Sequence, residues 1–275
     1  QLGHSQLLLT IALIALLALV FLKGFSESIG LATLIAVPYI LLNVIILSAG
    51  AWEIQLHPEL ISNWTLALEA RGDWSSVILV SALVFPKLAL GMSGFETGVS
   101  VMPLVRGAPS DREKKIPEER VRNTRKLLTA AALIMSVLLL FSSFITTLLI
   151  PEQAYQTGGP ANGRALSFLA HQLLGSYFGT VYDFATVLVL WFAGASAMAG
   201  MLNLIPRYLP RFGMAPVWVA FRRPLVIALF VIAVSVTWIF DANVDAQGSA
   251  YATGVLALML SAAVAVALAF WNEPQ

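Results

Sequence analysis

The sequence predicts an all-α, polytopic membrane protein, and three observations carry this prediction. Of its 275 residues, 59% are hydrophobic and 11% are charged, whereas soluble domains carry about 25% charged residues. Its mean hydropathy is +0.83. Its apolar residues also gather in runs close to the roughly 20 residues that a helix needs to cross a bilayer. A soluble fold of this length could not hide so much apolar surface.

Charge and cysteine content exclude several other classes of protein. The net charge is +1, so no overall field draws the chain to nucleic acid. The absence of cysteine excludes disulfides and thiolate metal sites. His4, His57 and His171 lie far apart and show no metal-ligand spacing. No nucleophile–base pair or phosphate-binding loop stands out, so we expect no enzyme activity, no metal and no organic cofactor.

Seven apolar runs are predicted to cross the membrane. In chain order they are residues 7–22, 29–47, 74–105, 127–150, 182–204, 224–240 and 251–270. The second run contains Pro38, which is expected to kink its helix because proline removes a backbone donor. Between the fourth and fifth runs, residues 165–174 are expected to form a short helix on the membrane surface.

Basic residues are concentrated in alternate loops between these runs. The two largest groups lie in residues 106–126 and 207–223, and Lys23 follows the first run. The other loops carry only Arg71 and Arg164. By the positive-inside rule the basic loops are cytoplasmic, so the chain is expected to start outside, cross seven times and end inside, in the plasma membrane. The chain also begins almost directly in an apolar run, so we expect it to be cut from a longer protein.

The third run carries polar groups and glycines where an unbroken apolar helix is expected. Residues 87–100 are Lys-Leu-Ala-Leu-Gly-Met-Ser-Gly-Phe-Glu-Thr-Gly-Val-Ser. An ionisable residue inside a membrane costs roughly 2.5–3.5 kcal/mol on insertion scales, so Glu96 is predicted to be functional. Each glycine weakens a helix by about 1 kcal/mol. We therefore expect the helix to unwind from Gly91 to Gly94 and to expose backbone groups that line a cavity.

Lys87 is the second charge of this run. Lys87 and Glu96 are about half a turn out of phase and about 13.5 Å apart along a continuous helix, so they pair only if the helix is broken. The alternative is a closely packed helix, because Gly91, Gly94 and Gly98 form a small-residue pattern that lets helices approach each other. The carboxylate of Glu96 favours a binding site over packing alone.

The fifth run contains a stretch of small residues, Gly194-Ala-Ser196-Ala-Met-Ala-Gly200. Such a stretch favours close packing between helices. The alternative is that Ser196 binds an ion or the substrate. Asp183 and Asp241 lie at the ends of predicted spans and are expected to be solvated.

The basic segment 106–126 is expected to include a cytoplasmic helix. Pro117 suits the first turn of that helix. Glu118 near its start and Lys126 near its end suit the helix dipole. A solvated helix that fixes the topology is favoured over a site for lipid headgroups.

Four short segments, taken in order, share a pattern with one family of membrane proteins. They are Gly24-Phe-Ser-Glu-Ser28, Ser93-Gly-Phe-Glu96, Lys114-Lys-Ile-Pro117 and Arg207-Tyr-Leu-Pro-Arg-Phe-Gly-Met-Ala-Pro216. They resemble motifs that amino acid–polyamine–organocation (APC) permeases carry at the start of the fifth helix, within the discontinuous sixth helix, after the sixth and after the eighth.

The resemblance implies the leucine-transporter-like fold of two inverted five-helix repeats, with this chain as the fourth to tenth helices. Residues 1–51 then form the last two helices of the first repeat, residues 52–73 an extracellular loop, and residues 74–275 the complete second repeat with its discontinuous helix. The first three helices, whose glycine break completes the substrate site, become an expected partner.

The resemblance also implies roles for individual residues. The backbone of Gly91, Met92, Ser93 and Gly94 would bind the amino or carboxylate group of a substrate, with Phe95 as an aromatic lid, Thr97 beside it and Glu96 as the proton-coupling group. Lys87 departs from the family pattern and would favour an anionic group. Ser196 falls near the sodium position of some relatives, and Tyr39 falls where some proton-coupled members carry a lysine.

The function expected from the resemblance is secondary active transport of amino acids or related amines. Proton coupling is favoured over sodium coupling. One alternative is transport of a different organic solute on the same fold, and another is a membrane sensor or scaffold that keeps the fold without transporting.

Overall fold

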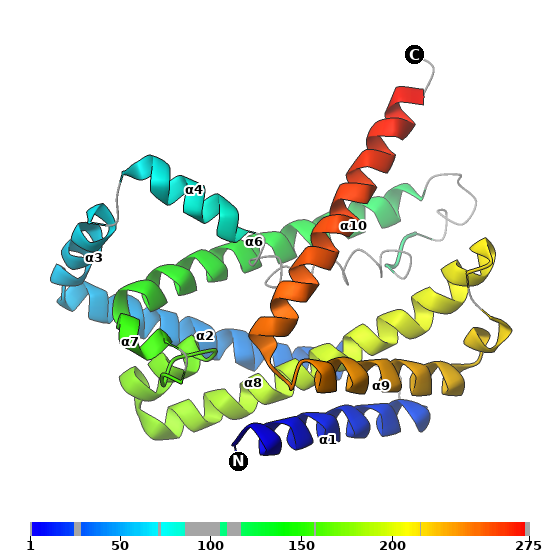
Figure 1. Cartoon of the computed structure of the whole chain (residues 1–275), viewed down its shortest axis with the longest axis horizontal. Coiled ribbons are helices and arrows are strands. Elements are labelled where there is room, and N and C mark those ends of the chain that lie inside the picture. The colour runs from blue at the N-terminus through cyan, green and yellow to red at the C-terminus, as the bar shows by residue number, and fades with distance from the viewer. Residues whose placement is uncertain are drawn as a thin grey trace. The chain divides into compact units, whose positions relative to one another are not determined.

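A computed structural model describes residues 2–24, 29–70, 73–85, 105–108, 117–156, 158–214 and 216–272 of the chain. In these ranges every regular element is a helix and no β-strand occurs (Figure 1). The prediction of an all-α protein is therefore confirmed for the described part of the chain.

The long helices follow the predicted apolar runs. They are α1 Leu2–Leu22, α2 Ile29–Leu56, α6 Glu118–Leu149, α8 Ala165–Tyr208, α9 Arg222–Ile239 and α10 Val244–Asn272. Shorter helices are α3 Glu59–Glu69, α4 Trp74–Val84, α7 Glu152–Tyr155, and the 3-10 helices η4 Leu209–Phe212 and η5 Val217–Ala220.

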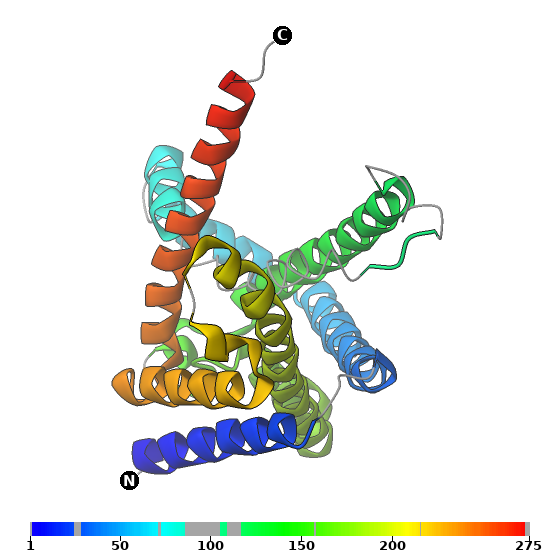
Figure 2. The ribbon, with the colours of Figure 1, turned by 90° about the vertical axis from the view of Figure 1, so that its right-hand side faces the viewer.

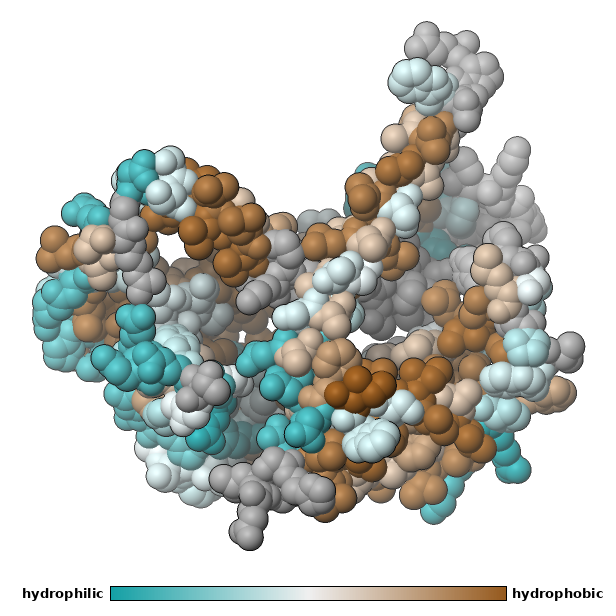
Figure 3. Space-filling view, viewed as in Figure 1, coloured by the Kyte–Doolittle hydropathy of each residue, from teal (hydrophilic) through white to brown (hydrophobic). Residues whose placement is uncertain are grey.

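Five of the described helices are long and apolar enough to cross a membrane. These are α2, α6, α8, α9 and α10, while the apolar parts of α1 and α4 are shorter. Large apolar side chains stand on the surface of the long helices; Leu140 of α6 is 70% exposed and Leu260 of α10 is 67% exposed. Figure 3 shows such side chains along the C-terminal half of α10. Exposed apolar surface of this extent indicates contact with lipid, as expected of an integral membrane protein.

Several predicted helix boundaries were wrong; α10, for example, begins at Val244 and not at residue 251, and the largest differences are in α2 and α6. α2 runs through Pro38 without interruption and ends at Leu56, well beyond the predicted residue 47. α6 begins at Glu118 and continues to Leu149, so the expected cytoplasmic helix and the fourth span are one helix. No glycine or proline occurs between residues 118 and 149, and the helix therefore has no reason to end where the lipid-facing run begins. Pro117 precedes this helix and does not lie in its first turn.

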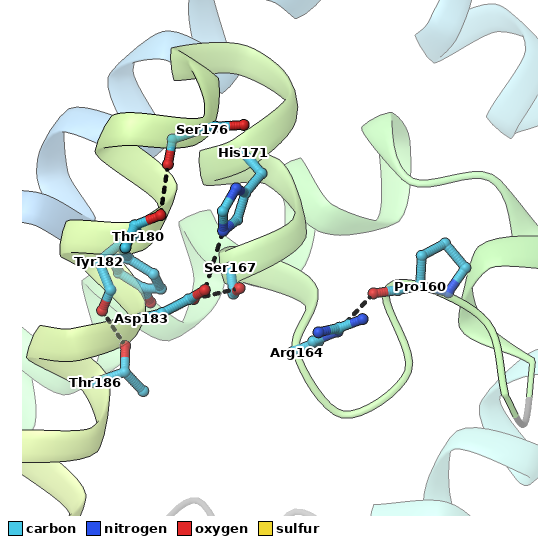
Figure 4. Close-up of polar contacts among 9 residues, drawn as sticks. All are labelled: Pro160, Arg164, Ser167, His171, Ser176, Thr180, Tyr182, Asp183 and Thr186. Carbon is cyan, nitrogen blue, oxygen red and sulfur yellow. Dashed lines mark hydrogen bonds and ion pairs between the residues drawn. The ribbon is translucent and has the colours of Figure 1, made fainter. Parts of the chain in front are cut away.

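The expected short helix at residues 165–174 is confirmed as a separate helix. The dihedral angles of Gly175 are φ 85° and ψ 168°, which are not helical, and they divide α8 into residues 165–174 and 176–208. Glycine has no Cβ and adopts a positive φ without steric penalty. The chain reverses at this residue, and the two helices form a hairpin (Figure 4).

The described residues fall into two compact units. The first contains α1, α4, α9, α10 and the 3-10 helices. Within it, α1 and α9 lie side by side and antiparallel (Figures 1 and 2). Phe21 of α1 and Val226 of α9 are fully buried. The predicted division of the chain by repeats, with boundaries at residues 51 and 73, stays a prediction.

The second unit contains α2, α3, α6, α7 and most of α8. Its core joins buried apolar side chains from four of these helices and the loop beside α7: Ile46, Leu47, Ile54, Ile145, Leu148, Ile150, Ala154, Ala161, Leu169, Ala170 and Tyr182. The approach of α2 to α6 requires Gly50, because a Cβ at this position would lie 2.5 Å from Cγ2 of Ile145. The polar clusters around Asp183 and Tyr182 belong to this unit.

Candidate functional site

The predicted substrate site in the third run lies outside the described residues. This applies to Lys87, Gly91, Met92, Ser93, Gly94, Phe95, Glu96 and Thr97. The break in the helix and the roles of these residues therefore stay predictions.

The structure describes the start of the third run, where Asp73 caps the N-terminus of α4. The carboxylate of Asp73 accepts hydrogen bonds from the hydroxyl of Ser75 at 2.5 Å, the hydroxyl of Ser76 at 2.6 Å and the backbone N–H of Ser76 at 3.3 Å. The Ser75 hydroxyl first, and then the two groups of Ser76, stabilise the charged form and lower the pKa of Asp73. This cap fixes the first residue of α4 at Trp74, where the run was predicted to begin.

Ser196 is the one predicted site residue that the structure describes. It lies in a helical part of α8 and is half-buried. Its neighbours Ala195 and Met198 are buried, with 2% and 6% of their surface exposed. The burial of this stretch agrees with close packing, which was the favoured interpretation, and a role for Ser196 as a ligand stays a prediction.

A polar latch, formed by Ser167, His171 and Asp183, holds the α8 hairpin together (Figure 4). The Ser167 hydroxyl donates to Oδ1 of Asp183 at 2.5 Å, and Nε2 of His171 lies 3.0 Å from Oδ2 of the same carboxylate. Arg164, whose Nε donates to the Pro160 carbonyl, adds a positive charge near Asp183. One carboxylate thus connects the helix before the Gly175 reversal to the helix after it.

The latch also depends on Gly179. A Cβ at Gly179 would overlap the imidazole ring of His171, so the ring lies directly against the backbone of the second helix. The side chain of Asp183 is 47% exposed and that of His171 is 38% exposed. The expected solvation of Asp183 agrees with this exposure, but its hydrogen bonds to Ser167 and His171 were not predicted. Its position at the end of a span gave no indication of the reversal at Gly175, which brings Ser167 and His171 opposite to it.

A second polar cluster, the tyrosine network, lies between α2 and α8. The hydroxyl of Tyr182 donates to Oδ1 of Asn43 at 3.1 Å, and Nδ2 of Asn43 donates to the carbonyl of Tyr39 at 2.7 Å. The two tyrosine hydroxyls are 3.4 Å apart, and the rings stack with centroids 5.7 Å apart. Since the single proton of Tyr182 goes to Asn43, Tyr39 is the donor between the two hydroxyls.

The tyrosine network satisfies polar groups that are otherwise costly to bury. Tyr182 is 2% exposed and Asn43 is 8% exposed, and burial without hydrogen bonds would cost each of them about 1–3 kcal/mol. Tyr39 was singled out from the sequence, but Asn43 and Tyr182 were missed. No local pattern connects them, because their partners are more than a hundred residues away in the chain.

A small cavity of about 260 Å³ opens between the end of α2, the start of α3 and residues 165–174. Its lining includes the polar side chains of Glu53, His57, Glu59 and Gln172, and its other lining residues are leucines. Nδ1 of His57 lies 3.3 Å from the carboxylate of Glu53. The two carboxylates give this opening a negative field that attracts cations.

Within the described residues, no group of three or more His, Asp or Glu side chains is placed to hold a metal ion. No protein-family model, no curated protein and no solved structure matches this chain. The family resemblance therefore rests on the four sequence motifs alone.

Proposed function

We propose that this chain forms part of a secondary active transporter for amino acids or related amines, built on the fold of the APC permeases. The observation that carries the proposal is Glu96, a carboxylate within a glycine-rich segment of an apolar run. It belongs to a protein whose described residues include five helices long and apolar enough to cross a membrane. Ionisable residues inside membranes mark substrate and ion pathways.

The proposed mechanism is alternating access around the segment Gly91–Gly94. Unwound backbone in this segment would bind the charged groups of the substrate, as the broken helices of transporters do. Phe95 would cover the bound substrate, and Glu96 would gain and lose the coupling proton. The seven spans, the inverted repeat and the cytoplasmic position of residues 106–126 and 207–223 are parts of this proposal. The three preceding helices of the parent protein would complete the site.

In a transporter the tyrosine network would lie beside the path of the ion or substrate. Ionisable side chains mark such pathways, whereas neutral polar side chains such as Asn also hydrogen-bond between membrane helices that only pack together. The competing explanation is that Tyr39, Asn43 and Tyr182 only attach α2 to α8, since hydrogen bonds between membrane helices contribute about 0.6 kcal/mol on average. A purely structural network predicts that its removal weakens the fold without changing transport.

The test is uptake by the full-length protein in proteoliposomes, measured for Glu96→Gln and Phe95→Ala. Coupling between two ligand sites is commonly worth about 1–3 kcal/mol, or roughly 5–150-fold, so Glu96→Gln should reduce proton-driven accumulation by a factor in that range. Phe95→Ala should raise the KM. The control is Glu118→Gln, which changes a carboxylate at the start of α6 and should leave uptake unchanged. If neither Glu96→Gln nor Phe95→Ala alters uptake or substrate binding, the proposed site is wrong.

Lys87 favours one alternative, transport of a different organic solute with an anionic group. A panel of amino acids, amines and organic acids offered to the same proteoliposomes separates the two substrate classes. A non-transporting sensor or scaffold would bind a ligand without moving it across the membrane, so binding without uptake in the complete protein would favour that class.

A further inference from the structure

α3 has an apolar face that the described part of the chain covers only in part, with Leu60 and Leu68 half-buried. Its apolar residues recur at the spacing of one helix face: Leu60, Ile61, Trp64, Ala67 and Leu68. None of the residues of α3 is buried. Ile61 is 42% exposed and Trp64 is 38% exposed. An amphipathic helix normally buries such a face against a core, so this face calls for another covering.

The apolar face of α3 borders a groove that ends on α6 and α7. A cavity of about 490 Å³ lies there, lined on one side by Trp64 and its neighbours on α3 and on the other by Leu148, Ile150 and Tyr155. Its polar lining residues are Asn63, Thr147 and Glu152. The hydroxyl of Tyr155 donates to the carbonyl of Thr146 at 2.9 Å. This bond fixes the ring of Tyr155 against the last turn of α6, and the far wall of the groove is therefore rigid.

The groove is continuous with the part of α6 that faces lipid. α6 is one of the helices long and apolar enough to span the membrane, and it exposes Leu140 and Phe144 on the turns that lead to the groove. Trp64 and Tyr155 line the groove where α6 ends, and tryptophan and tyrosine are the residues enriched at the boundary between membrane and water.

We propose that α3 is an interfacial helix and that acyl chains of bilayer lipids fill the groove between α3, α6 and α7. The apolar face of the helix then lies in the hydrocarbon edge of the membrane, with its polar face in water, which is the arrangement of amphipathic helices at membrane surfaces. The expected extracellular loop, residues 52–73, is thereby bound to the bilayer instead of standing free in solution.

The absence of cysteine from the chain gives a direct test. Ile61→Cys and Leu66→Cys each introduce the only thiol of the protein, one on the apolar face and one on the opposite face of the same helix. Both native side chains are exposed, Leu66 at 64%, so a nitroxide label at either position displaces no packed residue. The labelled full chain is placed in vesicles of phosphatidylcholine and phosphatidylethanolamine. Electron paramagnetic resonance then measures collisions of each label with oxygen, which enters hydrocarbon, and with a nickel chelate, which stays in water.

The ratio of oxygen to nickel collisions should be several-fold higher at position 61 than at position 66. Equal, water-like ratios at both positions would place α3 in solution and overturn the proposal. A label at position 61 that is shielded from both reagents would show that protein covers the face, and would overturn it as well. A second measurement needs no label, and it isolates the emission of Trp64 from that of the other six tryptophans. The difference in tryptophan emission between the native chain and Trp64→Phe should be smaller in vesicles of phospholipids brominated on their acyl chains than in unbrominated vesicles. An equal difference in both kinds of vesicle contradicts lipid contact at Trp64.

Discussion

Gly179→Ala should open the α8 hairpin by displacing the imidazole of His171. The added Cβ overlaps the ring, and the ring is the movable partner because its side chain is partly exposed. Once the ring has moved away, Nε2 no longer reaches the carboxylate of Asp183, which lies 3.0 Å from it in the native hairpin. The bond from Ser167 to Asp183 remains.

The size of the effect follows from the exposure of the pair. Because the side chains of His171 and Asp183 are 38% and 47% exposed, water screens their interaction, and its contribution is about 0.2–1 kcal/mol. Its loss should open residues 165–174 up to about fivefold more often, since 1.4 kcal/mol corresponds to a factor of ten. The same substitution also gains about 0.5–1 kcal/mol of helix propensity, as alanine replaces glycine. Overall stability is therefore a poor measure of the effect, and local opening is a good one.

The assay is amide hydrogen exchange of peptides from residues 165–174, with the chain in lipid nanodiscs at neutral pH. Gly254→Ala is the matched control, because Gly254 lies in α10 and a Cβ there meets no atom within 4 Å; it should leave exchange of the hairpin unchanged. In a His171→Ala background, Gly179→Ala should no longer accelerate exchange, because no ring remains to be displaced. Equal acceleration with and without His171 would refute the reasoning.

Two further predictions concern the tyrosine network and the start of α4. Tyr182→Phe should destabilise the chain by about 1–3 kcal/mol in detergent unfolding, because it leaves the buried amide of Asn43 and the half-buried hydroxyl of Tyr39 without their hydrogen bond. Tyr39→Phe should cost only about 0.5–1.5 kcal/mol. Equal losses would contradict the direction assigned to the hydrogen bonds. The pKa of Asp73 is lowered from 3.8, so its cap contributes above that value and is lost only as pH falls through the lower folded-state pKa. The protection factor of the first turn of α4, which is the exchange rate corrected for the intrinsic pH dependence of amide exchange, should therefore stay constant from neutral pH to about 4 and fall below it, and Asp73→Asn should abolish this change.

The positions of the helices could be predicted from hydropathy, but several of their ends could not. Hydropathy reports where a helix meets lipid, and a helix continues beyond that point until a residue stops it. α2 passes residue 47 and continues through Gly50 to Leu56, so a glycine in the sequence did not mark its end. The hairpin in α8 was predictable in part, since Gly175 separates two apolar stretches.

The contacts between helices could not be predicted from the sequence. Asp183 was interpreted from its place at the end of a span, and its partners Ser167 and His171 come from a helix that folds back upon it. Tyr182 meets α2 only because the chain between them forms α6 and returns. A single sequence carries no periodic signal for either contact. The glycine-rich segment around Glu96 lies outside the described residues, and its role remains a prediction from the residues themselves.

The polar latch and the tyrosine network both depend on adjacent residues of α8, Asp183 and Tyr182. Tyr182 bonds to Asn43 of α2, and Asp183 bonds to the helix of residues 165–174. Consecutive residues on a helix point about 100° apart, so one turn of α8 attaches to two different neighbours. Groups this close are expected to be energetically coupled, so a shift of this turn is expected to affect both sets of bonds.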